Sequence, residues 1–319
     1  ALPCDGRDYT RIDAAPQPTA WRCYHACMTV PCVSRCERIA VRGMHCNVRH
    51  WGSEDAPRLF VLHGWMDSSA TFQFVVEALW QAWHVIAPDL RGFGDSDWLR
   101  RPYWFSDYYA DLECLLDHYS PGEPVRLVGH SMGANIAAMY AAARPARVKQ
   151  VAMLDFLGLR PTGPDDAPGR LAGWLDELRE VPRMRIYRDR RALARRLMSA
   201  NPRLTPARAA FLAANVARTR ADGQIEMACD PWHKMVSPTL YHVEESMAAW
   251  RAIAVPVLML IADEGYVVDR FGSRPDEIRR RLECFRNVTV ENIAGAGHNL
   301  QHDQPEMVAA ALERFLSRD

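Results

Sequence analysis

Short apolar runs alternate with longer amphipathic segments along most of the chain. Apolar runs of about four to eight residues predict buried strands, and apolar positions at helical spacing predict helices. We expect a hairpin at 38–41 and 45–48 around Gly43, then strands at 58–62, 84–87, 124–128, 148–154, 254–261 and 288–293. Helices are expected at 71–83, at 106–118 with Ser106 as N-cap, and at 134–143, 275–285 and 305–316. This alternation predicts an α/β protein whose parallel sheet is covered on both faces.

The alternation stops between about residues 159 and 251. Helical segments at 170–178, 190–199, 206–217 and 244–251 follow one another there. Because the interval is too long for an ordinary loop, we interpret 159–251 as a helical cap inserted after the sixth strand of a core formed by 36–158 and 252–319. Residues 1–35 lack periodicity and are expected to form an irregular extension. Met28 resembles an alternative start, so we interpret 1–27 as a leader, a tag or an over-extended gene start.

Charge and cysteine content narrow the classes of partner and compartment. The 319 residues include 39 Lys+Arg and 39 Asp+Glu, so the formal net charge is zero and a broad electrostatic surface for nucleic acid is not expected. No apolar stretch reaches the ~18 residues of a membrane span. Nine cysteines, without an apolar signal segment, predict a reduced, cytoplasmic protein rather than a disulfide framework. The oligomeric state stays open.

Four clustered cysteines, Cys23, Cys27, Cys32 and Cys36, could imitate a zinc site. Their spacing lacks the two close pairs, separated by a long loop, that structural zinc sites use. The sequence also contains no Gly-rich phosphate loop and no H-E-x-x-H motif. We therefore predict no metal and no cofactor, and we expect a small molecule as the partner.

Residues 129–133, Gly-His-Ser-Met-Gly, have the form G-x-S-x-G. A predicted strand precedes them and an Ala-rich predicted helix follows, which is the strand–turn–helix setting of a nucleophile elbow. The glycines allow a sharp turn and a close approach of neighbouring chain. The turn then holds the Ser131 hydroxyl at the carboxyl edge of the sheet, where the following helix N-terminus favours developing negative charge.

This arrangement resembles the α/β-hydrolases that use a serine nucleophile, and the resemblance extends from Arg38 to the C-terminus. A narrower similarity is to the bacterial serine-hydrolase-like branch. The resemblance implies a mostly parallel, twisted sheet flanked by helices. It also implies that residues 63–65, His-Gly-Trp, supply an oxyanion-hole N–H from Trp65, and that Met132 supplies the second. Residues 88–96 are similar to an architectural turn of the family.

Residues 295–299, Gly-Ala-Gly-His-Asn, follow the last predicted strand. The family places its general base at this point, so the resemblance assigns that role to His298. The base takes the proton of Ser131 and later gives it to the leaving group.

The sequence leaves open which carboxylate completes a catalytic triad with Ser131 and His298. Many family members carry the acid just after the seventh strand, where this chain has Gly265, preceded by Asp263 and Glu264. Some place the acid after the sixth strand instead, where this chain has Asp155. We favour Asp155 and keep Asp263 and Glu264 as alternative acids.

These motifs predict a serine hydrolase that cleaves a small or medium carboxylic ester through an acyl-enzyme. Serine rather than aspartate at the elbow argues against a haloalkane dehalogenase or epoxide hydrolase. Trp65, His130 and Trp232 are candidate substrate-binding residues. Residues 230–235 line the entrance or fix the cap on the core. A C–C bond hydrolase or perhydrolase with the same triad, and a non-catalytic ligand-binding protein, remain alternatives.

Overall fold

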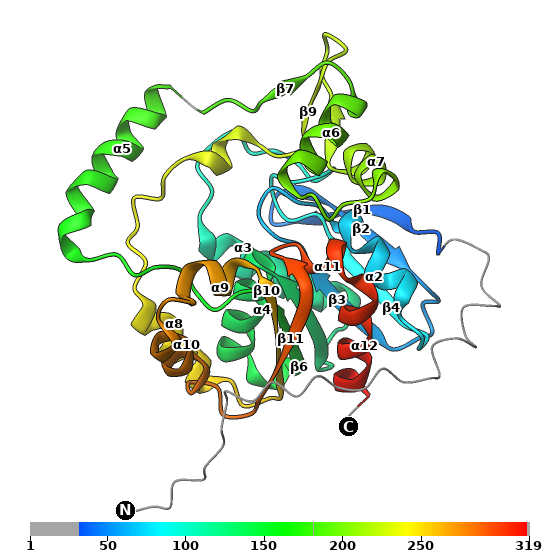
Figure 1. The fold of residues 1–319 in the computed structure, drawn as a ribbon, viewed down its shortest axis with the longest axis vertical. Helices are drawn as coiled ribbons and strands as arrows, with labels where there is room; N and C mark the ends of the chain where they lie inside the picture. The colour runs from blue at the N-terminus through cyan, green and yellow to red at the C-terminus, as the bar shows by residue number, and fades with distance from the viewer. Residues whose placement is uncertain (1–31, 181, 318–319) are drawn as a thin grey trace, which may run out of the picture.

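The computed structural model describes residues 32–180 and 182–317. An eight-stranded sheet forms the centre of the fold (Figure 1). Its strand order is β1-β2-β4-β3-β5-β6-β10-β11. β2 is antiparallel to β1 and β4, and every pair from β4 to β11 is parallel. The strands are β1 (Arg35–Val41), β2 (Met44–Trp51), β3 (Arg58–Leu62), β4 (His84–Pro88), β5 (Val125–His130), β6 (Val148–Leu154), β10 (Val257–Glu264) and β11 (Val288–Gly297). The predicted α/β fold with a mostly parallel sheet is confirmed.

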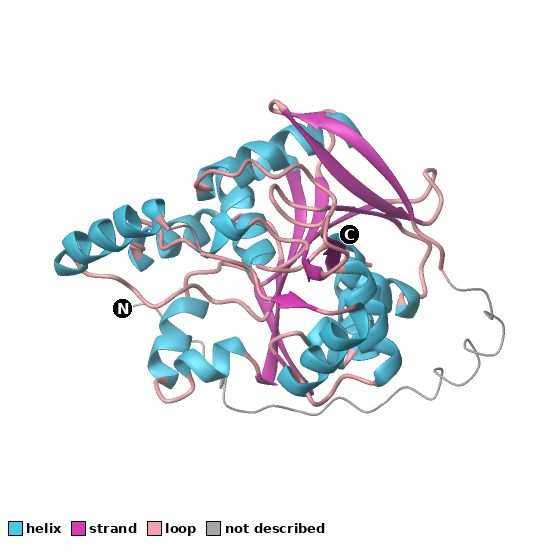
Figure 2. Ribbon diagram, turned by 90° about the horizontal axis from the view of Figure 1, so that it is seen from above, coloured by secondary structure: helices cyan, strands magenta, loops and turns pink. Residues whose placement is uncertain are grey.

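Successive residues of a central strand face opposite sides of the sheet, as strand geometry requires. In β3, Phe60 and Leu62 belong to one buried apolar cluster, whereas Leu59 and Val61 belong to another. Figure 2 shows helices on both sides of the strands. Because both faces are covered, the strands have continuous apolar runs rather than alternating polar positions.

Core helices cover the two faces. One face carries α3 (Phe105–Tyr119), α4 (Met132–Ala143), α8 (Val243–Ala252), α9 (Tyr266–Phe271) and α10 (Pro275–Leu282). The other carries the 3₁₀ turn η1 (Ser69–Phe72), α2 (Gln73–Ala78), α11 (Leu300–Asp303) and α12 (Pro305–Leu316). A further 3₁₀ turn, η2 (Pro145–Arg147), precedes β6.

The chain between β6 and β10 adds a second layer, at the top of Figure 1. It contains η3 (Pro164–Asp166), α5 (Ala167–Arg179), α6 (Arg190–Ala200), α7 (Pro206–Asn215), η4 (Pro231–Lys234) and an antiparallel sheet of β7 (Ile186–Tyr187), β9 (Ile225–Met227) and β8 (Ala217–Thr219). α6 and α7 have their own apolar cluster, with Leu193 and Leu212. α8 packs on α4 instead, and its Trp250 belongs to the core cluster. The boundaries 159–251 of the cap stay a prediction.

Several predicted helix ends are wrong: the helix expected at 275–285 ends at Leu282, and the one expected at 134–143 begins at Met132. The helix expected at 71–83 ends at Ala78, because the backbone N–H groups of Trp80 and Gln81 donate to the buried Glu313 carboxylate of α12, at 2.9 Å each. Ser106 is not the N-cap of its helix. α3 begins one residue earlier, so Ser106 lies inside the first turn and no side chain caps the helix.

Of the irregular extension expected at 1–35, only residues 32–35 belong to the described part of the chain. Cys23 and Cys27 lie outside it. Within 32–180 and 182–317, no group of three or more His, Cys, Asp or Glu side chains is placed to hold a metal ion. None of the helices in these same ranges has the length and apolar character needed to cross a membrane.

Candidate active site

Ser131 lies at the turn between β5 and α4 with φ +52° and ψ −113°. A positive φ costs a residue with a side chain on the order of 1–3 kcal/mol, so the surroundings must hold it. The glycines of the motif permit the close packing that does so. A Cβ on Gly129 would overlap the backbone of Gly133, and a Cβ on Gly133 would overlap the carbonyl group of Leu62. The Ser131 N–H also donates to the Leu154 carbonyl at 3.0 Å.

His298 follows β11, and its ring lies against the Ser131 hydroxyl. Nε2 is 3.0 Å from Ser131 Oγ, and Nδ1 is 2.8 Å from Asp155 Oδ2. The three residues follow β5, β6 and β11, whose carboxyl ends meet at one edge of the parallel sheet. The His298 side chain is 35% exposed while that of Asp155 is fully buried. The histidine is therefore open to a ligand and the carboxylate is not.

Asp155 is held by the backbone around the end of β10. Its φ is +48°, and its N–H donates to the Leu260 carbonyl at 2.7 Å. Oδ2 accepts from the Tyr266 N–H at 2.6 Å, and Oδ1 accepts from the Ala262 N–H at 3.3 Å. A buried carboxylate needs such donors, because burial without hydrogen bonds is costly. A Cβ on Gly265 would overlap Asp155 Oδ2, so the glycine leaves room for this carboxylate.

The two alternative acids bind other partners. Asp263 accepts from the N–H groups of Gly295 and Ala296 at 2.9 and 3.1 Å, and so holds the end of β11. Glu264 is exposed and forms an ion pair with Arg203. Among the three carboxylates that the sequence offers, Asp155 is the one bonded to the histidine.

His130 lies behind the histidine and is 2% exposed. Its Nε2 donates to the His298 carbonyl at 2.8 Å, so Nδ1 is the acceptor, and the Gln301 amide nitrogen lies 3.3 Å from it. Burial, and the nearby His298, hold the pKa of His130 well below its usual value, so the ring is neutral. The ring of His130 thus contacts His298, and its predicted role in substrate binding stays a prediction.

The loop at 63–65 runs directly beside Ser131. A Cβ on Gly64 would lie 3.3 Å from Ser131 Cβ, so glycine allows the close approach. His63 shapes the loop: its Nδ1 donates to the Gly64 carbonyl at 2.7 Å, and its Nε2 accepts from the Leu90 N–H at 2.9 Å. Met132 opens α4, where backbone N–H groups lack intrahelical acceptors. The N–H groups of residues 65 and 132 thus lie on segments that flank the hydroxyl.

A cavity of about 160 Å³ adjoins this site. Trp65 and Met132, which neighbour Ser131 in space or in the chain, line it together with Trp104, Trp174 and Trp232 of η4. Trp65 and Trp232 were expected near a substrate. Trp104 and Trp174 were missed. The aromatic run Tyr-Trp-Phe at 103–105 is a signal that could have pointed to Trp104, whereas Trp174 has no comparable signal.

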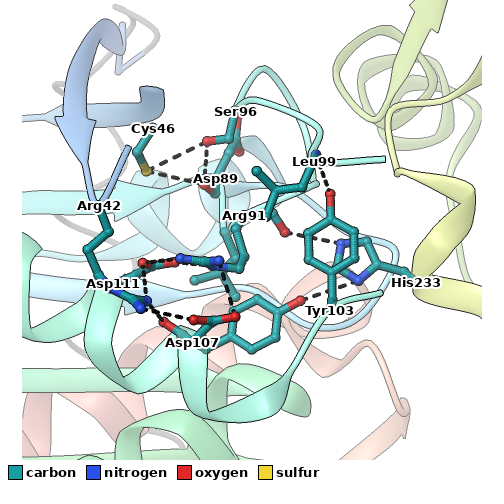
Figure 3. A network of polar contacts seen from close by, with 12 residues as sticks. Arg42, Cys46, Asp89, Arg91, Ser96, Leu99, Tyr103, Asp107, Asp111 and His233 are labelled. Atoms are coloured by element: carbon teal, nitrogen blue, oxygen red, sulfur yellow. Dashed lines mark hydrogen bonds and ion pairs between the residues drawn. The ribbon is translucent and has the colours of Figure 1, made fainter. Parts of the chain in front are cut away.

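His233 fastens the wall made by η4 to the core (Figure 3). Its ring stacks between those of Phe93 and Tyr103, with centroids 4.0 and 3.7 Å away. Nε2 donates to the Arg91 carbonyl at 3.1 Å, and Nδ1 lies 3.3 Å from the Tyr108 hydroxyl. Burial lowers the pKa of His233 to about 3, so the ring is neutral at physiological pH.

Asp230 completes this attachment. The fully buried carboxylate accepts from the Tyr103 hydroxyl at 2.8 Å and the Arg100 N–H at 2.9 Å. It also caps η4 by accepting from the Trp232 N–H at 3.3 Å. The segment 230–235 therefore both fixes the second layer on the core and lines the cavity, so the two sequence-based interpretations hold together.

The family model described as alpha/beta hydrolase fold matches residues 57–305, more than half of the chain. The chain belongs to the alpha/beta hydrolase family. This hydrolase is 27% identical to a serine hydrolase-like protein of Danio rerio, over 83% of both chains. It is 26% identical to a 2-(acetamidomethylene)succinate hydrolase of Mesorhizobium japonicum, over 88% of this chain and 94% of the relative.

Solved structures of other hydrolases share the fold. A thioesterase domain from the curacin biosynthetic pathway superposes with a TM-score of 0.79 at 24% identity, over 88% of this chain and 99% of the domain. An esterase of Mycobacterium tuberculosis superposes with a TM-score of 0.66 at 21% identity, over 89% and 91%. At these identities the likeness concerns the fold alone. The prediction that the protein is a hydrolase of this family is confirmed.

Proposed function

We propose that the protein is a serine hydrolase that cleaves a carboxylic ester through an acyl-enzyme. The observation that carries this proposal is the continuous chain from Ser131 Oγ through both nitrogens of His298 to the buried carboxylate of Asp155. Such a chain has the geometry needed to remove a proton from a hydroxyl and to stabilise the imidazolium that results. A non-catalytic role would leave the strained backbone at Ser131 without a purpose.

In the first half of the reaction, Ser131 Oγ attacks the ester carbonyl carbon while His298 Nε2 takes the hydroxyl proton. The tetrahedral intermediate collapses, the C–O bond to the alcohol breaks, and His298 gives its proton to the leaving alkoxide. Water then attacks the acyl-enzyme with the same base, and the carboxylic acid leaves as Ser131 regains its proton. Asp155 keeps the proton of His298 on Nδ1, so that Nε2 is free to act.

The oxyanion of each tetrahedral intermediate lies, in this proposal, between the N–H groups of Trp65 and Met132. Two fixed donors stabilise the developing charge, and the loss of one costs about 10²–10³ in rate in enzymes of this type. The N-terminus of α4 adds a favourable dipole at the same place. No metal or organic group takes part in these steps.

The experiment that tests the proposal is labelling with a fluorophosphonate, which reacts only with an activated serine. Ser131 Oγ displaces fluoride and forms a phosphonate ester, so the intact mass is expected to rise by one adduct per chain. Peptide mapping places the adduct on Ser131, and Ser131→Ala gives none while keeping the wild-type melting temperature. An unlabelled but folded wild-type protein would falsify the proposal.

Gly265→Ala is expected to lower kcat for ester hydrolysis about 10²-fold, because a displacement of about 1 Å at a catalytic group has this order of effect. The added methyl group overlaps Asp155 Oδ2 and pushes the carboxylate away from His298. The matched control is Gly169→Ala on α5, where a Cβ meets nothing within 4 Å. Steady-state kinetics on a methyl ester measures both, and equal kcat values for the two variants would contradict the role of Asp155.

A further inference from the structure

The cavity beside the nucleophile has walls made mainly of aromatic rings. Seven of the fourteen residues that line it are Trp, Tyr or Phe, among them Trp65, Trp104, Trp174 and Trp232, and Met132 lines it as well. Met132 directly follows Ser131 in the chain, so the cavity lies near the reacting hydroxyl, although Ser131 itself is not among the residues that line it. A substrate whose carbonyl group lies at Ser131 can place its neighbouring group among these rings.

No charged side chain lines this cavity among the residues that the structure describes. Arg170 and Lys234, which lie close to its walls in the chain, donate instead to the carbonyl groups of Ser237 and Arg183, at 3.0 and 2.8 Å. His233, which does line it, uses both ring nitrogens within the protein. A carboxylate or ammonium group bound here would lose water without gaining a counter-ion, which is costly.

The size of the cavity also limits its occupant. Its volume of about 160 Å³ is close to the ~150 Å³ of an apolar protein cavity that binds benzene. The wall made by η4 is anchored before any ligand arrives, because Asp230 caps η4 and His233 is stacked between Phe93 and Tyr103. The cavity therefore has room for one six-membered ring.

We propose that the ester cleaved by this enzyme carries an uncharged aromatic ring that binds in the cavity between Trp65, Trp104, Trp174 and Trp232. The inference rests on the proposed function and specifies its substrate class. Tryptophan faces and edges interact with a bound aromatic ring by offset stacking and edge-to-face contact, beyond the burial of apolar area. Trp104 and Trp174 already lie in such a tilted arrangement, with ring centroids 6.4 Å apart.

The test compares four methyl esters by the acid that each releases at constant pH. Methyl phenylacetate carries the ring, methyl cyclohexylacetate matches its size without a π-face, methyl hexanoate is a flexible chain, and monomethyl succinate carries a charge. We expect kcat/KM for the phenylacetate to exceed that of the cyclohexylacetate about fivefold and the hexanoate about tenfold, and that of the succinate half-ester about 100-fold or more. Equal values for the two ring esters, or a preference for the charged ester, overturn the proposal.

Trp232→Ala tests whether the aromatic lining of the cavity sets the preference for the ring, and Trp80→Ala is its matched control. Trp80 is 45% exposed and does not line the cavity. Trp232→Ala is expected to lower the ratio of kcat/KM between the phenylacetate and hexanoate esters about tenfold, and Trp80→Ala to leave that ratio unchanged. An unchanged ratio in both variants refutes the inference about the cavity. Fluorophosphonate labelling of Ser131 in the same samples separates this failure from a failure of the proposed hydrolase chemistry.

Discussion

Asp155→Asn is expected to lower kcat for ester hydrolysis about 10⁴-fold, the order of loss seen when a triad aspartate becomes an amide. Asp155 Oδ2 receives both the Nδ1–H of His298 and the N–H of Tyr266. The amide keeps the shape of the carboxylate but loses the charge that stabilises the imidazolium. Turning its NH₂ group toward His298 would also favour the wrong tautomer. Single-turnover and steady-state kinetics, together with the rate of fluorophosphonate labelling, measure the loss.

Asp263→Asn is the matched control for this prediction. Asp263 lies near the carboxyl end of β10, but it binds the backbone of Gly295 and Ala296 instead of His298. We expect kcat within about threefold of wild type and a small decrease in the melting temperature, because one of two backbone hydrogen bonds weakens. If Asp263→Asn loses activity and Asp155→Asn keeps it, the proposed triad is wrong.

Asp111→Ala is expected to lower the free energy of unfolding by about 3 kcal/mol, the lower end of the loss when one partner of a buried ion pair is removed. Both side chains of the Arg91–Asp111 pair are buried, with 5% and 7% exposed, and Arg91 binds both carboxylate oxygens (Figure 3). Arg42 adds a second ion pair to Asp111 at 3.1 Å. Without this carboxylate, Arg91 retains only Asp107, at 3.4 Å.

Urea unfolding followed by circular dichroism measures this change, with Asp117→Ala as the control. Asp117 lies on the same helix and pairs with Arg147 at 3.0 Å, but its side chain is 64% exposed. Exposed pairs of this kind contribute about 0–1 kcal/mol. If Asp111→Ala lowers the free energy of unfolding by less than about 1 kcal/mol, the buried pair contributes no more to stability than a surface pair. The result also bears on the cavity, since the Arg91 carbonyl accepts the hydrogen bond that orients His233.

The positions of most strands and helices along the chain, and the sharp turn at Ser131, were accessible from the sequence because they depend on local rules. A buried parallel strand requires a continuous apolar run, and the sharp turn at Ser131 requires glycine at 129 and 133. His298 lies in a Gly-rich segment after the last predicted strand, and the resemblance to the α/β-hydrolases implied its role. Each signal lies within a few consecutive residues, where steric limits on the backbone act.

The choice of acid and the shape of the cavity depended on the tertiary structure. Asp155 follows β6, and Asp263 and Glu264 end β10, at the same edge of the sheet, so only the local path of the backbone decides which carboxylate meets His298. The pairing of β10 with β11 shifts register between Ala262 and Glu264. No pattern in the sequence predicted this shift.

The residues that line the cavity were equally hard to predict, because they lie far apart in the sequence. Its walls combine Trp65, Trp104, Trp174 and Trp232, which four different segments of the chain supply. Local sequence carried the signals for Ser131 and His298, because backbone geometry at a turn admits few residue types. Packing between distant segments decided their partners, because side-chain contacts depend on loop paths that leave no periodic pattern in the sequence.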